Sequence, residues 1–196
     1  MQIDPETHGR SLYRTLTGSV VPRPIGWIST TGADGVDNLA PYSYCNIVSV
    51  RPPLLMFSPN RVPGEDLKDS ARNALDTGEF VHNVVTRDLA ERMNETSATL
   101  PPGESEFDHA DVARAETEKV APPRVADAKI AFECEVFDHL DVGSATLLLG
   151  EVVLVHADDS VTTDGKIDVE KVDAVGRLAG EWYATTDDRF RLERPE

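Results

Sequence analysis

Two long β-rich segments in the second half of the chain, residues 128–140 and 145–156, constrain its fold most. The side chains of the first segment fall on two alternating faces, with the period of two residues that a barrel strand needs. One face holds Ile130, Phe132, Cys134, Val136 and Asp138, and the other holds Ala131, Glu133, Glu135 and Phe137. We therefore expect two consecutive strands of a β-barrel, joined through residues 141–144.

The first half of the chain mixes shorter strands with short helices. A β-rich run, a glycine-containing turn and a second β-rich run predict a hairpin. The expected strands are 20–31, 36–44, 54–58 and 79–85, and the expected helices are 11–18, 66–77 and 88–95. A brief helix at 168–172 and a closing segment at 176–185 complete a mostly β fold, a closed or split barrel of about six strands with peripheral helices.

Residues 96–124 form a long polar excursion with prolines at both ends and few apolar residues. We expect at most one short helix in it, around residues 108–115, and a position on the surface as an arm or lid. The 196 residues then make one domain, 1–196.

The chain is strongly acidic, with a formal net charge of −16 from 35 acidic and 19 basic residues. This sign argues against nucleic acid and anionic membranes as partners. A dispersed acidic coat with little lysine is typical of a protein from a salt-loaded, halophilic cytoplasm, although a merely acidic protein from another habitat stays open. The start has no signal-peptide pattern and no apolar stretch reaches a membrane span, so we expect a cytoplasmic protein.

The two cysteines and the histidines do not form a metal-binding pattern. Cys45 and Cys134 lie far apart without C-x-x-C spacing, which indicates neither a disulfide framework nor a zinc site. The histidines show no paired spacing, so we expect no metal site. A role for Cys45 stays open, and His82 is expected to be a core or interface histidine that could also reach a ligand pocket.

Residues 38–53 combine polar and apolar side chains in a way that suggests the wall of a ligand site. A strand followed by a loop rich in Ser, Asn and Tyr can offer hydroxyls, amides and backbone N–H groups to a planar ligand with polar edges. Candidates for this wall are Ala40, Pro41, Ser43, Tyr44 and Asn46. The alternative is an ordinary edge strand with its exit loop.

Five motifs in order resemble the flavin reductase-like, flavoredoxin-type family. They are residues 21–30, 38–43, Ser49 with Pro52–Pro53, Lys68-Asp69-Ser70 with Asn73, and residues 78–85. The resemblance runs from about residue 12 to residue 192. It implies an FMN-binding split β-barrel and a homodimer with two flavins near the subunit interface.

The residues and the resemblance together give a set of candidate FMN contacts. They are Asn38, Ala40, Pro41, Tyr42, Ser43, Tyr44, Asn46, Ser49, Lys68, Ser70, Arg72, Asn73 and Tyr183. Lys68, Ser70 and Arg72 cluster at the start of a predicted helix, whose positive end favours the FMN phosphate, unless they form only a solvated helix face. Trp27 either borders the flavin ring or fills the barrel.

The resemblance implies an oxidoreductase in which NADH or NADPH passes hydride to flavin N5. Because the chain has no GxGxxG fingerprint, a nicotinamide would have to stack in an open cleft. The competing class is a binding protein that holds FMN, or even haem, without reductase activity, or an electron carrier fed by another protein. The sequence identifies no catalytic acid or base.

Overall fold

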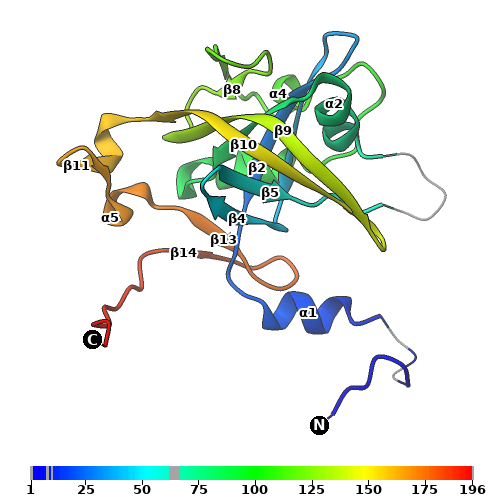
Figure 1. Cartoon of the computed structure of the whole chain (residues 1–196), viewed down its shortest axis with the longest axis vertical. Coiled ribbons are helices and arrows are strands. Elements are labelled where there is room, and N and C mark those ends of the chain that lie inside the picture. The colour runs from blue at the N-terminus through cyan, green and yellow to red at the C-terminus, as the bar shows by residue number, and fades with distance from the viewer. Residues whose placement is uncertain (1, 8, 10, 62–66, 196) are drawn as a thin grey trace.

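The computed structural model describes residues 2–7, 9, 11–61 and 67–195, and its described part is a β-barrel with peripheral helices (Figure 1). The helices are α1 (Tyr13–Ser19), α2 (Asp69–Thr77), η1 (Arg87–Leu89), α3 (Ala90–Glu95), α4 (Glu106–His109), η2 (Asp159–Val161) and α5 (Val169–Val172). The strands of the main sheet are β2 (Gly26–Thr31), β3 (Asp37–Tyr42), β4 (Cys45–Val50), β5 (Pro53–Phe57), β6 (Glu79–Val84), β9 (Ile130–Val142) and β10 (Ala145–Ala157). The minor strands are β1 (Arg23–Pro24), β7 (Arg114–Ala115), β8 (Arg124–Val125), β11 (Thr162–Thr163), β12 (Lys166–Ile167), β13 (Val175–Arg177) and β14 (Tyr183–Thr185).

The main sheet is antiparallel and has the order β3-β2-β6-β9-β10-β5-β4. Its two edge strands, β3 and β4, are consecutive in the chain and separated only by Ser43 and Tyr44. Three Cα steps of about 3.8 Å span the gap from Tyr42 to Cys45, so the two edges of the sheet must approach each other there. The sheet therefore curls into a barrel at this corner, which is the mostly β fold that the sequence predicts.

The long hairpin of β9 and β10 forms the centre of the sheet, as predicted. Its register shifts twice, between Leu149 and Gly150 and between Val152 and Leu154, and such bulges bend a strand. Gly150 also faces Phe80, whose ring carbon would lie 2.2 Å from a Cβ at this position. Only glycine lets the Phe80 ring pack against β10 there.

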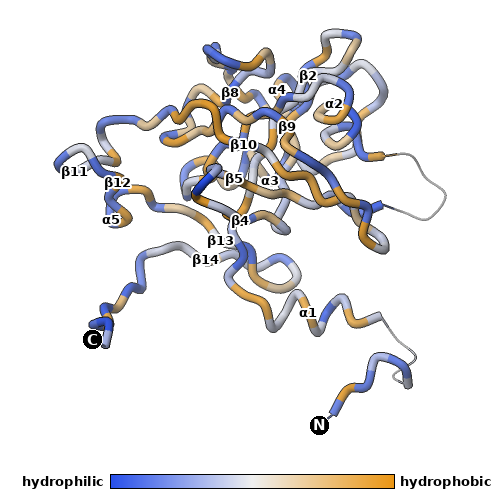
Figure 2. The backbone as a smooth tube through the Cα atoms, in the orientation of Figure 1, coloured by the Kyte–Doolittle hydropathy of each residue, from blue (hydrophilic) through white to orange (hydrophobic). Residues whose placement is uncertain are grey.

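The core has two main parts because β2 is buried on both faces. Ile28 faces the barrel interior with Phe57, Phe80 and Leu148. Trp27 belongs to the second part and lies outside the interior, together with Leu39, Met93, Phe107, Val112 and Val125. Orange, hydrophobic stretches of the tube run along the central strands in Figure 2. Trp27 thus fills the core, with its indole N–H donating to Thr96 Oγ1 at 2.8 Å.

Two predicted element boundaries need correction. The stretch after Tyr44, predicted as a loop, is the edge strand β4, because it pairs with β5. The expected helix 66–77 begins at Asp69, and residue 66 lies outside the described residues. The other strands and helices of the first half lie within a few residues of their predicted ranges.

The excursion 96–124 is packed against the barrel, which corrects the expectation of a surface arm or lid. Phe107 and Val112 lie in the core, and Val120 packs with Val81 and Ala131. The short helix expected around 108–115 is α4, which begins two residues earlier and ends at His109, and Arg114–Ala115 form the strand β7. A few well-placed apolar residues therefore anchor a segment that is polar on average.

A buried carboxylate holds the second half of this segment. Glu133 on β9 is fully buried and accepts hydrogen bonds from the backbone N–H groups of Glu118, Lys119 and Val120 at 2.9, 2.6 and 3.2 Å. Its Oε1 also lies 2.5 Å from His156 Nε2 on β10. Burial acts to raise the pKa of Glu133, but the hydrogen bonds from His156 and the three N–H groups outweigh it and lower that pKa.

We expect Glu133→Ala to reduce the free energy of unfolding by about 3 kcal/mol at pH 7, because three backbone donors lose their acceptor. Glu135→Ala is the matched control on the same strand, where the side chain is exposed and the loss should stay within about 0.5 kcal/mol. Because folding lowers the pKa of Glu133, its stabilisation is complete above the unfolded pKa of about 4.3 and is lost as the pH falls through the folded pKa. Urea denaturation at pH 7 and at about pH 3 measures both effects. Equal losses in the two variants at pH 7 would contradict the anchoring role.

Candidate flavin site

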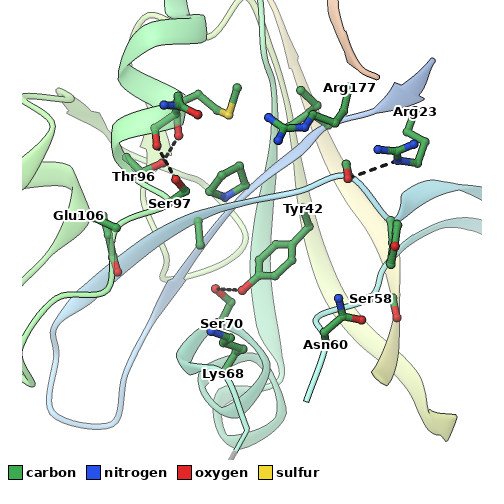
Figure 3. Close-up of a pocket in the computed structure, with 18 of the residues that line it drawn as sticks. Arg23, Tyr42, Ser58, Asn60, Lys68, Ser70, Thr96, Ser97, Glu106 and Arg177 are labelled. Carbon is green, nitrogen blue, oxygen red and sulfur yellow. Dashed lines mark hydrogen bonds between the residues drawn. The ribbon is translucent and has the colours of Figure 1, made fainter. Parts of the chain in front are cut away.

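A cavity of about 440 Å³ opens at the corner where the two sheet edges meet. One wall is the end of β3 with Ser43 and Tyr44, and the other walls are the start of α2, residues 93–100, and the turn between β13 and β14. The volume lies in the range of roughly 300–1,000 Å³ that is usual for small-molecule sites. Figure 3 shows Ser70 and Lys68 at one end of the pocket and Arg23 and Arg177 away from them.

The α2 end of the pocket offers hydrogen-bond donors. Ser70 Oγ accepts from Asn38 Nδ2 at 2.8 Å and from the Tyr42 hydroxyl at 3.1 Å, which leaves the Ser70 hydroxyl hydrogen free to donate. Lys68 precedes the first helical residue, and its side chain makes no capping hydrogen bond to α2. A helix N-terminus beside a lysine and a serine favours an anion.

Two carboxyl groups lie at this same end. Glu106 Oε2 accepts the backbone N–H of Leu39 at 2.9 Å, and Asp69 pairs with Arg72. Burial raises the pKa of Glu106, against the hydrogen bond from Leu39. Burial also raises the pKa of Tyr42 to about 12, opposed by its hydrogen bond with Ser70 and reinforced by Glu106 and Asp69. Tyr42 is therefore a neutral hydroxyl at any physiological pH.

The opposite end of the pocket is positive. Arg23 is only 8% exposed, and its guanidinium donates to the carbonyl oxygens of Thr17, Val20 and Leu178 at 2.7, 2.7 and 2.8 Å. Its Nε lies 3.5 Å from Ser43 Oγ. Among the described residues no carboxylate lies within ion-pair distance of Arg23.

The β13–β14 turn closes this end with a second arginine. The Arg177 guanidinium lies over the Tyr183 ring, 4.5 Å from its centroid, and hydrogen-bonds to the Tyr183 hydroxyl and the Gly180 carbonyl. The Tyr183 hydroxyl donates to Asn94 Oδ1 at 3.2 Å. These contacts tie the C-terminal turn to the end of α3 across the mouth of the pocket.

Part of the pocket lining is apolar. Ile25, Ala40, Pro41, Met93 and Leu100 contribute to it. A slot of this kind, with polar groups at both ends, suits a ligand that has a flat apolar body and polar extremities.

The structure brings most of the predicted contact residues to this one pocket. Those that line it are Asn38, Ala40, Pro41, Tyr42, Ser43, Tyr44, Lys68, Ser70 and Tyr183. They come from β3, its exit corner, α2 and β14, which are far apart in the sequence. Their contact with a cofactor stays a prediction.

Two predicted residues on β4 do not line this pocket. Asn46 is exposed, and its Oδ1 accepts the backbone N–H of Ile47 at 2.8 Å. Ser49 lies beside a register shift, and its Oγ accepts from the N–H of Arg51 at 3.2 Å. Because β4 is an edge strand and not a loop, these side chains serve the strand itself.

Two predicted residues on α2 also face elsewhere. Arg72 is held by Asp69 one turn earlier on the helix. Asn73 donates to Thr30 Oγ1 at 3.3 Å and so fastens α2 to β2. Both residues lie about one turn further along α2 than Asp69 and Ser70, which line the pocket.

Sequence reasoning missed several lining residues, including Arg23, Ser97, Glu106 and Arg177. Arg23 offered a weak signal, because it is a cation between two prolines in an otherwise apolar run. Glu106 and Ser97 belong to the excursion, whose average polarity hides which side chains turn inward.

The remaining candidates are accounted for by burial. His82 is buried against the edge of the Phe132 ring, and burial lowers its pKa to about 4, so it stays neutral. Cys45 and Cys134 are buried free thiols, and burial raises both pKa values, that of Cys45 to about 12. Within the described ranges no cluster of His, Cys, Asp and Glu side chains could hold a metal ion. None of the helices in those ranges is long and apolar enough to cross a membrane.

Comparison with solved structures gives matches over nearly the whole chain. Nitrilotriacetate monooxygenase component B from Bacillus cereus is 37% identical, with a TM-score of 0.93 and coverage of 98% of both chains. The 2-nitrobenzoate 2-nitroreductase NbaA from Pseudomonas fluorescens is 29% identical, with a TM-score of 0.90 and coverage of 100% of this chain and 96% of that chain. A protein from Shewanella frigidimarina assigned as a flavin reductase with a split barrel domain is 23% identical, with a TM-score of 0.83 and coverage of 98% and 94%, and it shares the fold.

A match to a family model assigns the chain to a protein family. The model of the flavin reductase-like domain matches residues 17–169, which include β3, the Ser43–Tyr44 corner, α2 and the excursion. The match therefore covers most of the pocket described above as well as most of the barrel. The chain belongs to the flavin reductase-like family, and it is a flavin-related oxidoreductase with a split-barrel fold.

Proposed function

We propose that the protein binds FMN in the pocket at the sheet corner and acts as an NAD(P)H-dependent flavin oxidoreductase. The observation that carries this proposal is the polarity of the pocket. It has the N-terminus of α2 with Lys68 and Ser70 at one end, Arg23 with Ser43 at the other, and apolar residues such as Ala40 and Pro41 in its lining. FMN has the matching parts, a phosphate, a flat ring and a polar ring edge.

The residues at the α2 end would hold the phosphate. The Ser70 hydroxyl is oriented by Asn38 and Tyr42, so it is set in place before a ligand arrives. The Lys68 side chain is exposed at the pocket rim and supplies the compensating charge. This fit selects a flavin with a terminal phosphate, and it is our reason for proposing FMN over FAD.

The other end would hold the ring. Ala40 and Pro41 offer a flat apolar surface, and Ser43 and Tyr44 offer hydroxyl groups to the ring edge. Arg23 adds a buried positive charge next to Ser43, which favours electron density on the ring edge. When bound, the flavin supplies hydride and electron-transfer chemistry between a reduced nicotinamide and an acceptor. The chain then needs only to bind and orient the flavin and its substrate.

The alternative is an FMN-binding protein without reductase activity, or a carrier that receives electrons from another protein. The observation that favours it is the contact of Arg177, Tyr183 and Asn94 across the pocket mouth, because a nicotinamide must displace or pass this turn. Phe107 and Glu133 anchor the excursion to the barrel, so this segment would not open as a lid for a nicotinamide. Two of the solved structures discussed above are named as a monooxygenase component and a nitroreductase, and these names support the proposal of reductase activity.

We further propose a homodimer from a salt-rich cytoplasm. Exposed apolar side chains gather on edge strand β4, at Ile47, Val48 and Val50, and on and next to α1, which projects from the barrel in Figure 1. Exposed apolar side chains on a sheet edge mark a surface that another chain can bury. A second copy of this chain has the same surface and can bury it in a symmetric dimer. The net charge of −16 would make two copies repel each other at low salt. The buried free cysteines are compatible with a reducing compartment.

The purified protein should be yellow and release FMN, and Lys68→Ala should weaken FMN binding at least tenfold while changing riboflavin binding little. The reason is that Lys68 contacts only the phosphate in this proposal. Fluorescence titration of the apoprotein with both flavins measures the two affinities. Lys166→Ala, an exposed lysine on β12 outside the pocket lining, is the control and should change neither. Equal losses of FMN and riboflavin binding would place Lys68 elsewhere.

Reduction by a nicotinamide separates the enzyme from the binding protein. We expect NADH or NADPH to bleach the bound flavin within seconds in an anaerobic stopped-flow experiment. Asn94→Ala, which removes the hydrogen bond that Tyr183 donates to Asn94, should keep or increase this rate. If only dithionite bleaches the flavin in both proteins, the enzyme is excluded and the carrier or binding protein remains.

The dimer should weaken in Val50→Asp, because this variant puts a charge on the apolar edge strand β4. The wild-type dimer should tighten when KCl rises from about 0.1 M to about 1 M, because the Debye length falls from about 10 Å to about 3 Å and the salt screens the repulsion between the two acidic chains. Sedimentation velocity gives the dissociation constant in each case. Val169→Asp, which is exposed on α5 away from β4, is the control. A wild-type protein that is monomeric at both salt concentrations would refute the dimer.

A further inference from the structure

The α2 end of the pocket has a charge imbalance that a phosphate would increase. Its lining holds the carboxyl groups of Glu106 and Asp69 and one lysine, Lys68. Arg72 on the same helix pairs with Asp69 and balances that carboxylate. A phosphate monoester brings a charge of about −1.5 to −2 at neutral pH. An ionised Glu106 would therefore face this anion, and no salt bridge among the described residues pairs Glu106 with a cation.

Glu106 cannot turn away to relieve this repulsion. Its side chain is 8% exposed, and its Oε2 is held by the backbone N–H of Leu39 at 2.9 Å. The next residue, Phe107, is fully buried in the core beside Trp27. Asp69 differs, because its side chain is 66% exposed and already paired.

Titratable groups from several elements surround Glu106. Tyr42 from β3 stays neutral, since burial raises its pKa to about 12. Asp69 on α2 and His109 on the same helix as Glu106 are close enough to act on it electrostatically. Lys68 lines the same pocket, and Arg114 is engaged by Asp37 and Asp108. Burial already raises the pKa of Glu106 before any ligand is present.

We propose that Glu106 takes up a proton from solvent when the phosphate of FMN binds at Lys68 and Ser70, and returns it to solvent when FMN leaves. The inference rests on the proposed function. Protonation removes one negative charge and converts the carboxyl group from an acceptor into an O–H donor that can point into the pocket. The affinity for FMN then depends on pH through this protein side chain, whereas the affinity for riboflavin does not.

Calorimetric titration in buffers of different ionisation enthalpy counts the protons taken up per flavin. We compare wild-type apoprotein with Glu106→Gln, which keeps an oxygen for the Leu39 N–H, and with Glu104→Gln, an exposed neighbour. Measurements start at about pH 7.5, where the phosphate, with a second pKa of about 6, is already ionised. For each FMN bound, wild type and Glu104→Gln should take up as much as one proton more than Glu106→Gln takes up. The FMN dissociation constant should rise up to tenfold per pH unit in those two proteins and stay level in Glu106→Gln.

Riboflavin provides the matched ligand, because it lacks the phosphate. Its binding should take up no proton in any of the three proteins, and its affinity also reports whether Glu106→Gln is folded. Equal proton counts for FMN in wild type and Glu106→Gln, or equal counts for FMN and riboflavin in wild type, overturn the proposal. The second comparison needs no variant. If FMN binds and depends on Lys68 while either equality holds, only this inference fails, whereas no FMN binding at all would also remove the proposed function.

Discussion

The structure depends on the two-residue link between β3 and β4. These strands are opposite edges of one seven-stranded sheet, yet only Ser43 and Tyr44 separate them. A link this short forces the edges together and makes the sheet a barrel. It also leaves an open corner, because β3 and β4 share no ladder of their own among the described pairings. The pocket lies at that corner, so closure of the fold and formation of the site have the same cause.

The excursion 96–124 completes both the core and the site. Phe107 and Val112 cover the outer face of β2, and Glu133 fixes the backbone around Lys119. The same segment delivers Thr96, Ser97 and Glu106 to the pocket. A segment that carries core residues, a buried carboxylate anchor and pocket walls must be rigid for the pocket to keep its shape. Binding groups set in place before the ligand arrives lose less entropy when it binds.

The sequence predicts the strands and the candidate flavin wall better than it predicts how distant segments meet. The alternation in 128–140 and the glycine turn at 32–35 are local signals, and both correspond to observed hairpin strands. β4 was missed as a strand because its polar residues Asn46 and Ser49 lie on an edge, where pairing needs no apolar pattern. Arg23 and Glu106 were missed because their place in the pocket comes from tertiary contacts with Ser43 and Leu39. The family resemblance connected five motifs in a fixed order along the chain. The spacing of residues alone does not connect them.

The most direct test of the account is a crystal structure of the protein soaked with FMN. The account predicts the phosphate within hydrogen-bond distance of Ser70 and Lys68, and the ring against Pro41 with its polar edge toward Ser43 and Arg23. FMN in the opposite orientation, with its phosphate on Arg23, or flavin density at another place on the barrel, would contradict it.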